Sequence, residues 1–237
     1  MAASDELVLP PYYLRRPPMP RDAKTLAAFD ALYARAEASG GAMLDYNLKA
    51  PIWQFFCHVA DTRPVLLHGS GNAAIDMFEP RQPHDVSAFG DQNAVYAASD
   101  GLWPMYFAIL DRARFEMSLI NSSMQLDLGD GRRGEPFYFF SISDKALMQR
   151  PFRDGTIYLL PRDGFMQQPP FRHEGRDIHV AHWASLAPVK PLARFAVRPE
   201  DFPLLAQLRG HDDEPTFARA RANPDGFPWV EDDQPKR

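Results

Sequence analysis

Two short segments of this chain hold residue types that could bind a flat ligand together. His68-Gly69-Ser70 follows the apolar run at 65–67, which is typical of a short buried strand. A histidine at a strand end can hydrogen-bond a hydroxyl group, and a glycine beside it lets the backbone approach a ligand closely. Tyr96 lies in a second expected strand at 93–98. We expect these two strand ends to carry the chemistry of the protein.

A helix with further aromatic residues is expected to follow the second strand. Residues 102–114 have helical character, with Pro104 in the first turn. Tyr106 or Phe107 could face Tyr96 across a flat ring, because the helix register leaves both open. If that ring carries a positive charge, a cation–π interaction would add roughly 0.5 to 2 kcal/mol when it is desolvated.

The elements that position these residues indicate a mixed domain. Asp22 can cap a helix that ends at Gly40-Gly41, and its apolar residues share one face: Leu26, Phe29, Tyr33 and Ala36. Strands are expected at 115–128, 137–142, 156–160 and within 183–197, with a turn at Asp130-Gly131. The order of elements predicts an α+β fold whose second half is mainly β.

The two segments within 64–110 are similar to the first two motifs of ADP-ribosyltransferases of the diphtheria-toxin and poly-ADP-ribose polymerase branch. The matching strings are LLHGSGNAAIDMFEP and AVYAASDGLWPMYFAIL. The resemblance implies an ADP-ribosyltransferase-like split β-sheet core with flanking helices, and NAD as the substrate. It further implies that the ligand contacts lie at these positions: His68, Gly69, Ser70, Tyr96, and Tyr106 or Phe107.

The third motif of that family departs from the family pattern here. The family carries a glutamate on a late strand, whose charge suits the positive ribose that forms as nicotinamide leaves. His182, in the string HWAS, takes that place, with Glu174 and Asp177 as substitutes under a shifted alignment. The resemblance thus implies His68, Tyr96 and His182 as catalytic residues. ADP-ribose would pass to water or to a protein or nucleic-acid acceptor.

Three other functions remain open at this point. Ser99 lies in an A-x-S-x-G variant of a nucleophile elbow, which would suit a serine α/β-hydrolase, although the spacing from the HG turn is short for that fold. His179 and His182 could begin a metal site but need further ligands, so no metal is expected. A non-catalytic domain that binds a ligand or a partner is the third.

The whole chain favours one domain with two extensions. Prolines crowd residues 1–21, which predicts an extended Pro-rich arm; residues 22–209 form the domain, and the polar segment 210–237 is expected to be a tail. The net charge of −5 argues against a broad nucleic-acid surface. Cys57 lies in an apolar run and is expected to be a buried, inert thiol. Without a signal sequence or a run of ~20 apolar residues, we expect a cytoplasmic protein away from membranes, with export as an effector left open.

Overall fold

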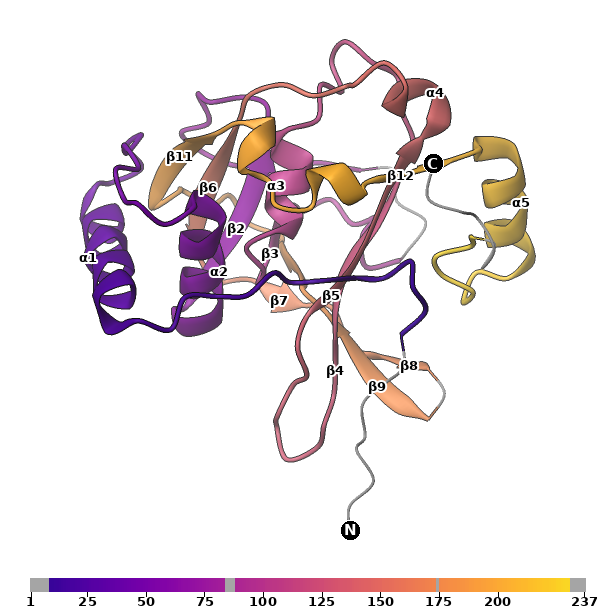
Figure 1. Cartoon of the computed structure of the whole chain (residues 1–237), viewed down its shortest axis with the longest axis horizontal. Coiled ribbons are helices and arrows are strands. Elements are labelled where there is room, and N and C mark those ends of the chain that lie inside the picture. The colour runs from indigo at the N-terminus through magenta and orange to yellow at the C-terminus, as the bar shows by residue number, and fades with distance from the viewer. Residues whose placement is uncertain (1–8, 84–87, 174, 231–237) are drawn as a thin grey trace.

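Asp22 starts the first helix of the computed structural model, which describes residues 9–83, 88–173 and 175–230 (Figure 1). Its carboxylate accepts a hydrogen bond of 2.8 Å from the backbone N–H of Thr25, and α1 (Ala23–Ala38) then buries the expected apolar face. Gly40 and Gly41 follow with φ values of 68° and 102°. A left-handed backbone that L side chains rarely adopt therefore ends the helix at the expected glycines.

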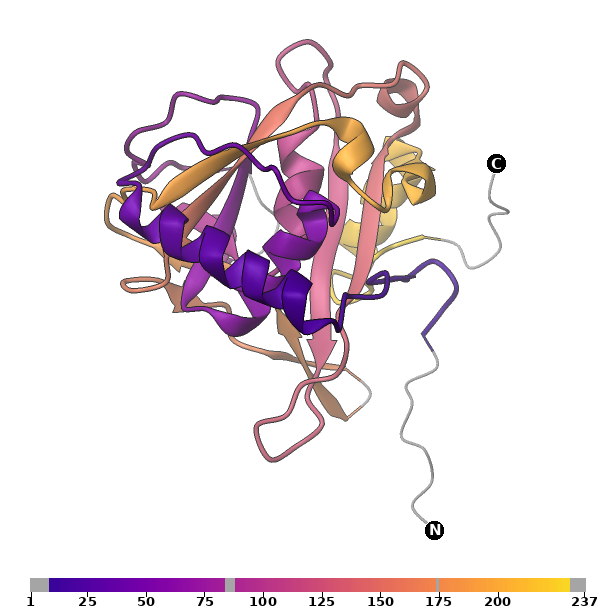
Figure 2. The same ribbon diagram turned by 60° about the vertical axis from the view of Figure 1, so that its left-hand side comes forward.

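The second helix supplies much of the core. α2 (Ile52–Thr62) packs beside α1 at one side of the molecule, and its buried residues include Phe55, Phe56 and Cys57 (Figures 1 and 2). Cys57 is fully buried, and this desolvation raises the pKa of its thiol well above the ordinary value. The thiol is thus a packing group, as its apolar neighbours predicted.

Within the described residues the strands form two six-stranded sheets, which confirms the α+β prediction. The first sheet has the order β1-β5-β4-β9-β8, and β12 also pairs with β5. All pairings in it are antiparallel except that of β12 with β5. Its strands are β1 (Leu14–Arg15), β4 (Leu119–Leu126), β5 (Phe137–Ser143), β8 (Phe171–His173), β9 (Arg176–Val180) and β12 (Arg209–His211).

The second sheet has the order β11-β6-β2-β3-β10-β7 and contains both segments singled out in the sequence. Its strands all pair antiparallel. They are β2 (Val65–Ser70), β3 (Val95–Ala98), β6 (Gly155–Pro161), β7 (Met166–Gln167), β10 (His182–Ser185) and β11 (Ala193–Val197). The remaining helical elements are α4 (Asp144–Leu147), α5 (Asp213–Ala222) and the 3₁₀ turns η1 (Pro199–Asp201) and η2 (Leu205–Gln207).

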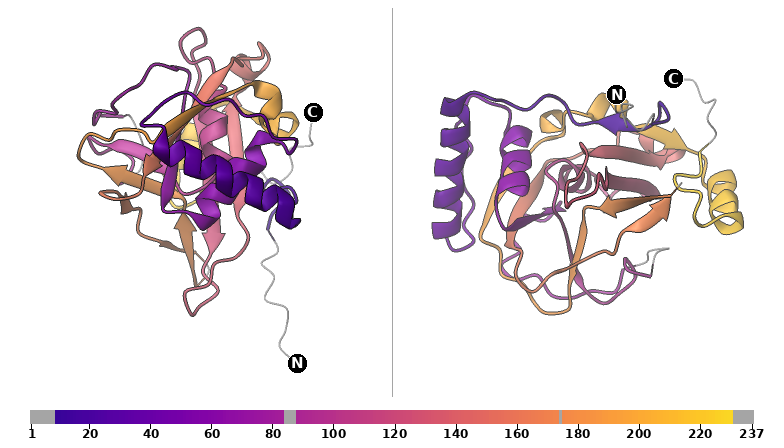
Figure 3. Two further views of the ribbon diagram at one scale, coloured as in Figure 1. Left: turned by 90° about the vertical axis from the view of Figure 1, so that its left-hand side faces the viewer. Right: turned by 90° about the horizontal axis from the view of Figure 1, so that it is seen from below.

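Helix α3 (Trp103–Ala108) lies in the centre of the molecule, between the two sheets (Figure 3). It packs so closely on the second sheet that a Cβ on Gly69 would lie 1.8 Å from the carbonyl oxygen of Pro104. A Cβ on Gly155 of β6 would likewise lie 2.0 Å from the carbonyl oxygen of Ala108. On the other side, the hydroxyl of Tyr106 donates a 2.8 Å hydrogen bond to the carbonyl oxygen of Ser141 in β5. The helix therefore ties one sheet to the other.

The helix is shorter than the expected range 102–114. Leu110 forms a β-bridge with Phe152, and the backbone N–H of Asp111 donates to the carbonyl oxygen of Pro151 at 2.9 Å. These contacts to a distant segment replace the hydrogen bonds that would continue the helix. The expectation of a longer helix was wrong because tertiary pairing overrides the local helical preference.

The segment that contains β1 and the C-terminal segment both attach to the first sheet. Arg16, just after β1, is buried between α2 and the β3–α3 turn, where it forms ion pairs with Asp61 and, at 3.2 Å, with Asp100. The hydroxyl of Tyr138 in β5 donates to the same Asp100 carboxylate at 2.8 Å. At the other end of the chain, strand β12 and helix α5 lie in the stretch that its polarity had assigned to a tail.

Candidate ligand-binding site

The two segments expected to carry the chemistry meet where β2 and β3 diverge. These neighbouring strands pair at a single position, Leu67 with Ala98, whereas β2 pairs with β6 over its whole length. Beyond this point the side chain of His68 spans the gap, and its Nδ1–H donates a 2.7 Å hydrogen bond to the backbone carbonyl of Tyr96. The structure thus brings His68 and Tyr96 together through a side chain to backbone contact.

The surroundings of His68 favour its neutral form. Burial lowers the pKa of its imidazole, and the charge of Arg81 lowers it further, against a smaller opposing effect of the hydrogen bond to Tyr96. Since the proton of the neutral ring sits on Nδ1, the lone pair is on Nε2. The ring also packs edge-on against Phe78 at 4.7 Å. His68 therefore presents a hydrogen-bond acceptor in a fixed orientation.

Gly69 and Ser70 follow His68 on β2. The absence of a side chain at Gly69 is required by α3, because an added Cβ would collide with the backbone of Pro104. Sequence reasoning had assigned that absence to the approach of a ligand. The hydroxyl of Ser70 accepts a 3.1 Å hydrogen bond from the backbone N–H of Asn72. Both residues are partly exposed, so they line the end of the strand where the sheet opens.

The side chains of His68 and Tyr96 project to opposite faces of the sheet. Leu66 belongs to a small apolar cluster on one face, and Ala98 to the main core on the other. Because side chains alternate along a strand, His68 shares the face of Leu66 and Tyr96 the face of Ala98. One ligand can contact both side chains only by passing through the gap where β2 and β3 diverge.

The hydroxyl of Tyr96 is hydrogen-bonded to the loop before β3, so the ring is the part of this side chain that a ligand could contact. The hydroxyl donates to the carbonyl oxygen of Phe89 at 2.9 Å and accepts from the backbone N–H of Gln92 at 2.9 Å. The ring of His182 stacks on the Tyr96 ring with centroids 4.9 Å apart and an interplanar angle of 29°. Tyr96 thus offers a stacking face that an imidazole already covers.

Of the two candidate partner rings on α3, Tyr106 belongs to the core. It is fully buried, its ring lies 4.8 Å from that of Phe140, and its hydroxyl is bonded to β5. Assigning Tyr106 to the ligand was therefore wrong, since both its ring and its hydroxyl serve the packing of α3 between the sheets. Phe107 is partly exposed, with its ring 6.4 Å from that of Trp103.

Three aromatic rings surround His182, and we call Phe89, Tyr96 and Trp103 the aromatic box. The ring of Phe89 lies 5.3 Å from the imidazole and that of Trp103 lies 5.6 Å from it, both edge-on. The indole N–H of Trp103 donates to the Oδ1 atom of Asn121 at 2.6 Å, which fixes this wall of the box. Sequence reasoning missed Phe89, which lies in a loop without a periodic pattern. Trp103 could have been found, since it lies four residues before Phe107 on one helix.

Several alternatives raised by the sequence find different partners. The Nε2 atom of His179 lies 3.1 Å from a carboxylate oxygen of Asp127, away from the box that holds His182. No three potential metal ligands among histidine, cysteine, aspartate and glutamate come together within the described ranges. Asp177 pairs with Arg172 at 3.8 Å on the β8–β9 hairpin. Glu174 lies outside the described residues.

The serine-hydrolase alternative has little geometric support in the part of the chain that the structure describes. The backbone N–H of Ser99 donates to the carbonyl oxygen of Ala181 at 3.0 Å, which joins β3 to the crossover before β10. No histidine hydrogen-bonds the hydroxyl of Ser99 there, and the neighbouring carboxylate of Asp100 accepts from the N–H groups that begin α3. Ser99 therefore lacks a general base.

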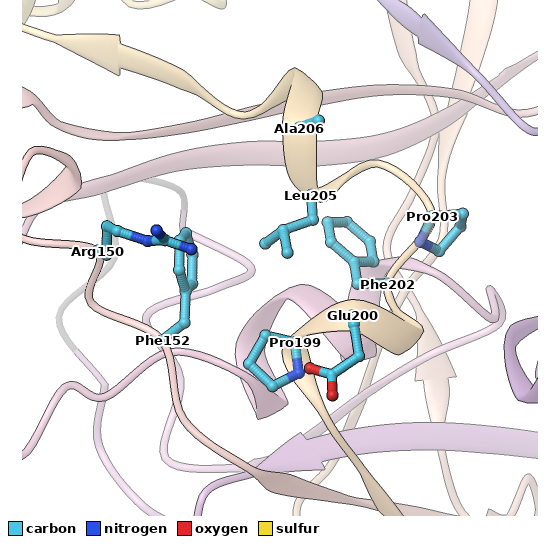
Figure 4. A pocket seen from close by; sticks show the side chains of 8 residues that line it. All are labelled: Arg150, Phe152, Pro199, Glu200, Phe202, Pro203, Leu205 and Ala206. Atoms are coloured by element: carbon cyan, nitrogen blue, oxygen red, sulfur yellow. The ribbon is translucent and has the colours of Figure 1, made fainter.

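Two surface cavities lie apart from these residues. The larger, of about 770 Å³, is an open hollow lined by residues of η1 and η2 together with Arg150 and Phe152 (Figure 4). A second, of about 360 Å³, lies between residues 43–52 and 196–201. Neither cavity is lined by a residue of the candidate site.

Comparison with protein-family models, with curated proteins and with solved structures finds no match to this chain. No helix in the described part of the chain is both long and apolar enough to cross a membrane. The assignment of a function therefore depends on the geometry of the site and on the motifs in the sequence.

Proposed function

We propose that the protein binds NAD where β2 and β3 diverge, on an ADP-ribosyltransferase-like core that follows the Pro-rich arm of residues 1–21. The observation that carries this proposal is the hydrogen bond from His68 to the backbone carbonyl of Tyr96. It joins the two sequence segments whose motifs resemble that family, and it orients the imidazole at the gap between the strands.

Each residue of the site would have a definite task. The Nε2 atom of His68 would accept a hydrogen bond from a ribose hydroxyl, since its lone pair is available in the neutral ring. Ser70 and the backbone of Gly69 would line the opening. The nicotinamide ring would stack on Tyr96, with Phe107 as the second aromatic contact. The ligand would pass through the gap, because His68 and Tyr96 project to opposite faces.

The reaction of such a site would break the bond between the nicotinamide nitrogen and the ribose carbon. Nicotinamide would leave with the bonding electrons, and the oxygen of water, or a nucleophile of a protein or nucleic-acid acceptor, would attack the cationic ribose. His182 takes the place of the expected glutamate, so its neutral imidazole would accept the proton of the attacking group. A protonated imidazole would repel the cationic ribose, and we therefore expect weak activity at acidic pH.

Titration calorimetry with NAD tests the binding. We expect saturable binding in the millimolar range or tighter, at least fivefold weaker in Tyr96→Ala because the stacking face is lost. Tyr96→Phe is the matched control: it keeps the ring and loses only the hydroxyl, which contacts the loop before β3. No heat at millimolar NAD, or equal affinities for all three proteins, would refute the proposal.

Release of nicotinamide distinguishes an enzyme from a domain that only binds. If the site is catalytic, incubation with NAD liberates nicotinamide, and His68→Ala slows this release at least tenfold whereas Ser99→Ala does not. Mass spectrometry after incubation of the protein with labelled NAD and a cell lysate then separates transfer to a macromolecule from hydrolysis. Binding without release supports the second candidate, a non-catalytic domain, which the replacement of the glutamate by His182 favours.

A further inference from the structure

The aromatic box encloses the imidazole of His182 as a binding site encloses a flat ligand. The ring stacks on Tyr96 at 4.9 Å, while Phe89 and Trp103 meet it edge-on at 5.3 and 5.6 Å. These separations lie in the range that aromatic pairs prefer. Both His182 and Tyr96 are partly exposed, so the stacked pair can be reached from solvent.

The backbone of His182 is fixed by strand pairing, whereas its side chain is partly exposed. The residue pairs with Ala98 of β3, and its carbonyl oxygen accepts a 2.9 Å hydrogen bond from the backbone N–H of Gln168. Nδ1–H of the imidazole donates to the side-chain oxygen of the same Gln168 at 3.1 Å. The ring can thus leave the box by side-chain rotation, without a change in the backbone, once its polar contacts open; the hydrogen bond to the partly exposed Gln168 is one of them.

We propose that His182 is an internal occupant of a slot for a flat heteroaromatic ring, and that a ligand ring stacks on Tyr96 only after the imidazole has rotated out. The inference rests on the proposed function in taking the nicotinamide ring as the ligand ring. It adds that the site is closed by its own side chain and that Gln168 helps to hold it closed. NAD binding then competes with an intramolecular contact.

Such competition lowers the apparent affinity in a calculable way. If only a fraction of molecules has the imidazole outside the box, the apparent dissociation constant equals the intrinsic one divided by that fraction. Removal of the imidazole makes the slot permanently open. We therefore expect His182→Ala to bind free nicotinamide and NAD at least tenfold more tightly than the unaltered protein. Gln168→Ala should strengthen binding by a smaller factor, about two- to fivefold, because it removes one hydrogen bond of the closed state.

The experiment titrates nicotinamide, and separately NAD, into four full-length proteins. They are the unaltered chain, His182→Ala, Gln168→Ala and the matched control His179→Ala, which truncates a histidine three residues away whose partner is Asp127. Calorimetry gives the dissociation constants, and circular dichroism confirms that each variant is folded. The expected order of affinity is His182→Ala, then Gln168→Ala, then the unaltered chain and His179→Ala together.

Each result is decisive for a different claim. If the unaltered protein binds NAD and His182→Ala binds it equally or more weakly, the imidazole does not compete with the ligand, so the inference fails while the proposed function stands. If none of the proteins binds either compound, both fail. Should His182→Ala not fold, Gln168→Ala decides the matter, together with the proton resonances of the His182 ring in the unaltered protein. Those resonances should lose the ring-current shift of the box as nicotinamide is added, and unchanged resonances at saturation would overturn the inference.

Discussion

His182 and His211 are both enclosed at the end of a strand, but their enclosures are built from opposite chemistry. The side chain of His211 at the end of β12 is 2% exposed, and both of its ring nitrogens are hydrogen-bonded. Nδ1 lies 2.7 Å from the hydroxyl of Ser141, and Nε2 lies 2.7 Å from the hydroxyl of Ser118. His182 instead lies among the rings of the aromatic box. Hydrogen bonds to both nitrogens fix an imidazole in one orientation. Aromatic rings instead contact the ring without such bonds, so another flat ring can take the place of the imidazole.

A hydroxyl cluster, made of Ser118, Ser141, His211 and Asp213, fastens the C-terminal segment to the first sheet. Ser118 donates to Asp213, so the Nε2–H of His211 donates to Ser118. On the other side of the ring, Nδ1 lies against the hydroxyl of Ser141, which also contacts the carbonyl oxygen of Arg209 at 3.3 Å. The cluster connects the residue before β4 with β5, β12 and the start of α5. The enclosure of His211 is therefore structural, whereas we propose that His182 exchanges with a ligand ring.

The largest expected effect is on stability, and it separates the two histidines. We expect His211→Ala to lower the free energy of unfolding by about 2 to 4 kcal/mol, because it leaves a buried cavity and removes the ring that the hydroxyls of Ser118 and Ser141 contact. His182→Ala should cost about 1 kcal/mol or less, since the ring is partly exposed. Urea denaturation at pH 7.5 measures both. Equal losses of unfolding free energy for the two variants would show that both histidines contribute alike to stability, against this expectation.

Acid should weaken the protein through its buried histidines. Burial lowers the pKa of His211 below the ordinary 6.5, although Asp213 and Asp144 act in the opposite direction, and burial lowers that of His68 as well. Below about pH 6.5 the unfolded chain then binds more protons than the folded one, so the free energy of unfolding falls as the pH decreases. The contribution is fully present above that pH. We expect urea midpoints to decrease between pH 7 and pH 5.

The control for this pH effect is a pair of substitutions. His211→Gln and His68→Gln should each make the dependence of the urea midpoint on pH shallower over the same window. The carboxylates whose pKa is lowered by hydrogen bonds, such as Asp30 and Asp127, are titrated below it. A slope identical to that of the unaltered protein in both variants would show that other groups cause the acid sensitivity.

The smallest effect is expected at Asp213, the outermost member of the hydroxyl cluster. Its side chain is 54% exposed, so its ion pair with His211 is screened by water. Asp213→Asn should change the free energy of unfolding at pH 7.5 by less than about 1 kcal/mol. Because Asp213 raises the pKa of His211, its loss should extend the acid-sensitive range to lower pH. A loss as large as that of His211→Ala would mean that the carboxylate, not the imidazole, holds the cluster together.

Local sequence signals predicted the helices and strands well where capping and turn residues mark their ends. Asp22 and the glycines at 40 and 41 delimit α1, and the turn at Asp130-Gly131 separates β4 from β5, with positive φ values at both turn residues. Caps and turns depend on neighbouring residues alone, so a sequence reader can find them. The polar stretch after residue 210 was misleading, because β12 and α5 are held by hydroxyl and imidazole groups as well as by apolar contacts.

The sequence by itself determined the α+β class, the presence of strands at His68 and Tyr96, and the buried state of Cys57. Only the tertiary structure decided which aromatic residue of α3 belongs to the core, because Tyr106 and Phe107 are neighbours in sequence and differ only in the face they present. It also decided that Phe89, Tyr96 and Trp103 surround His182. Such an enclosure joins a loop, two strands and a helix, and contacts between distant segments are set by packing rather than by local sequence.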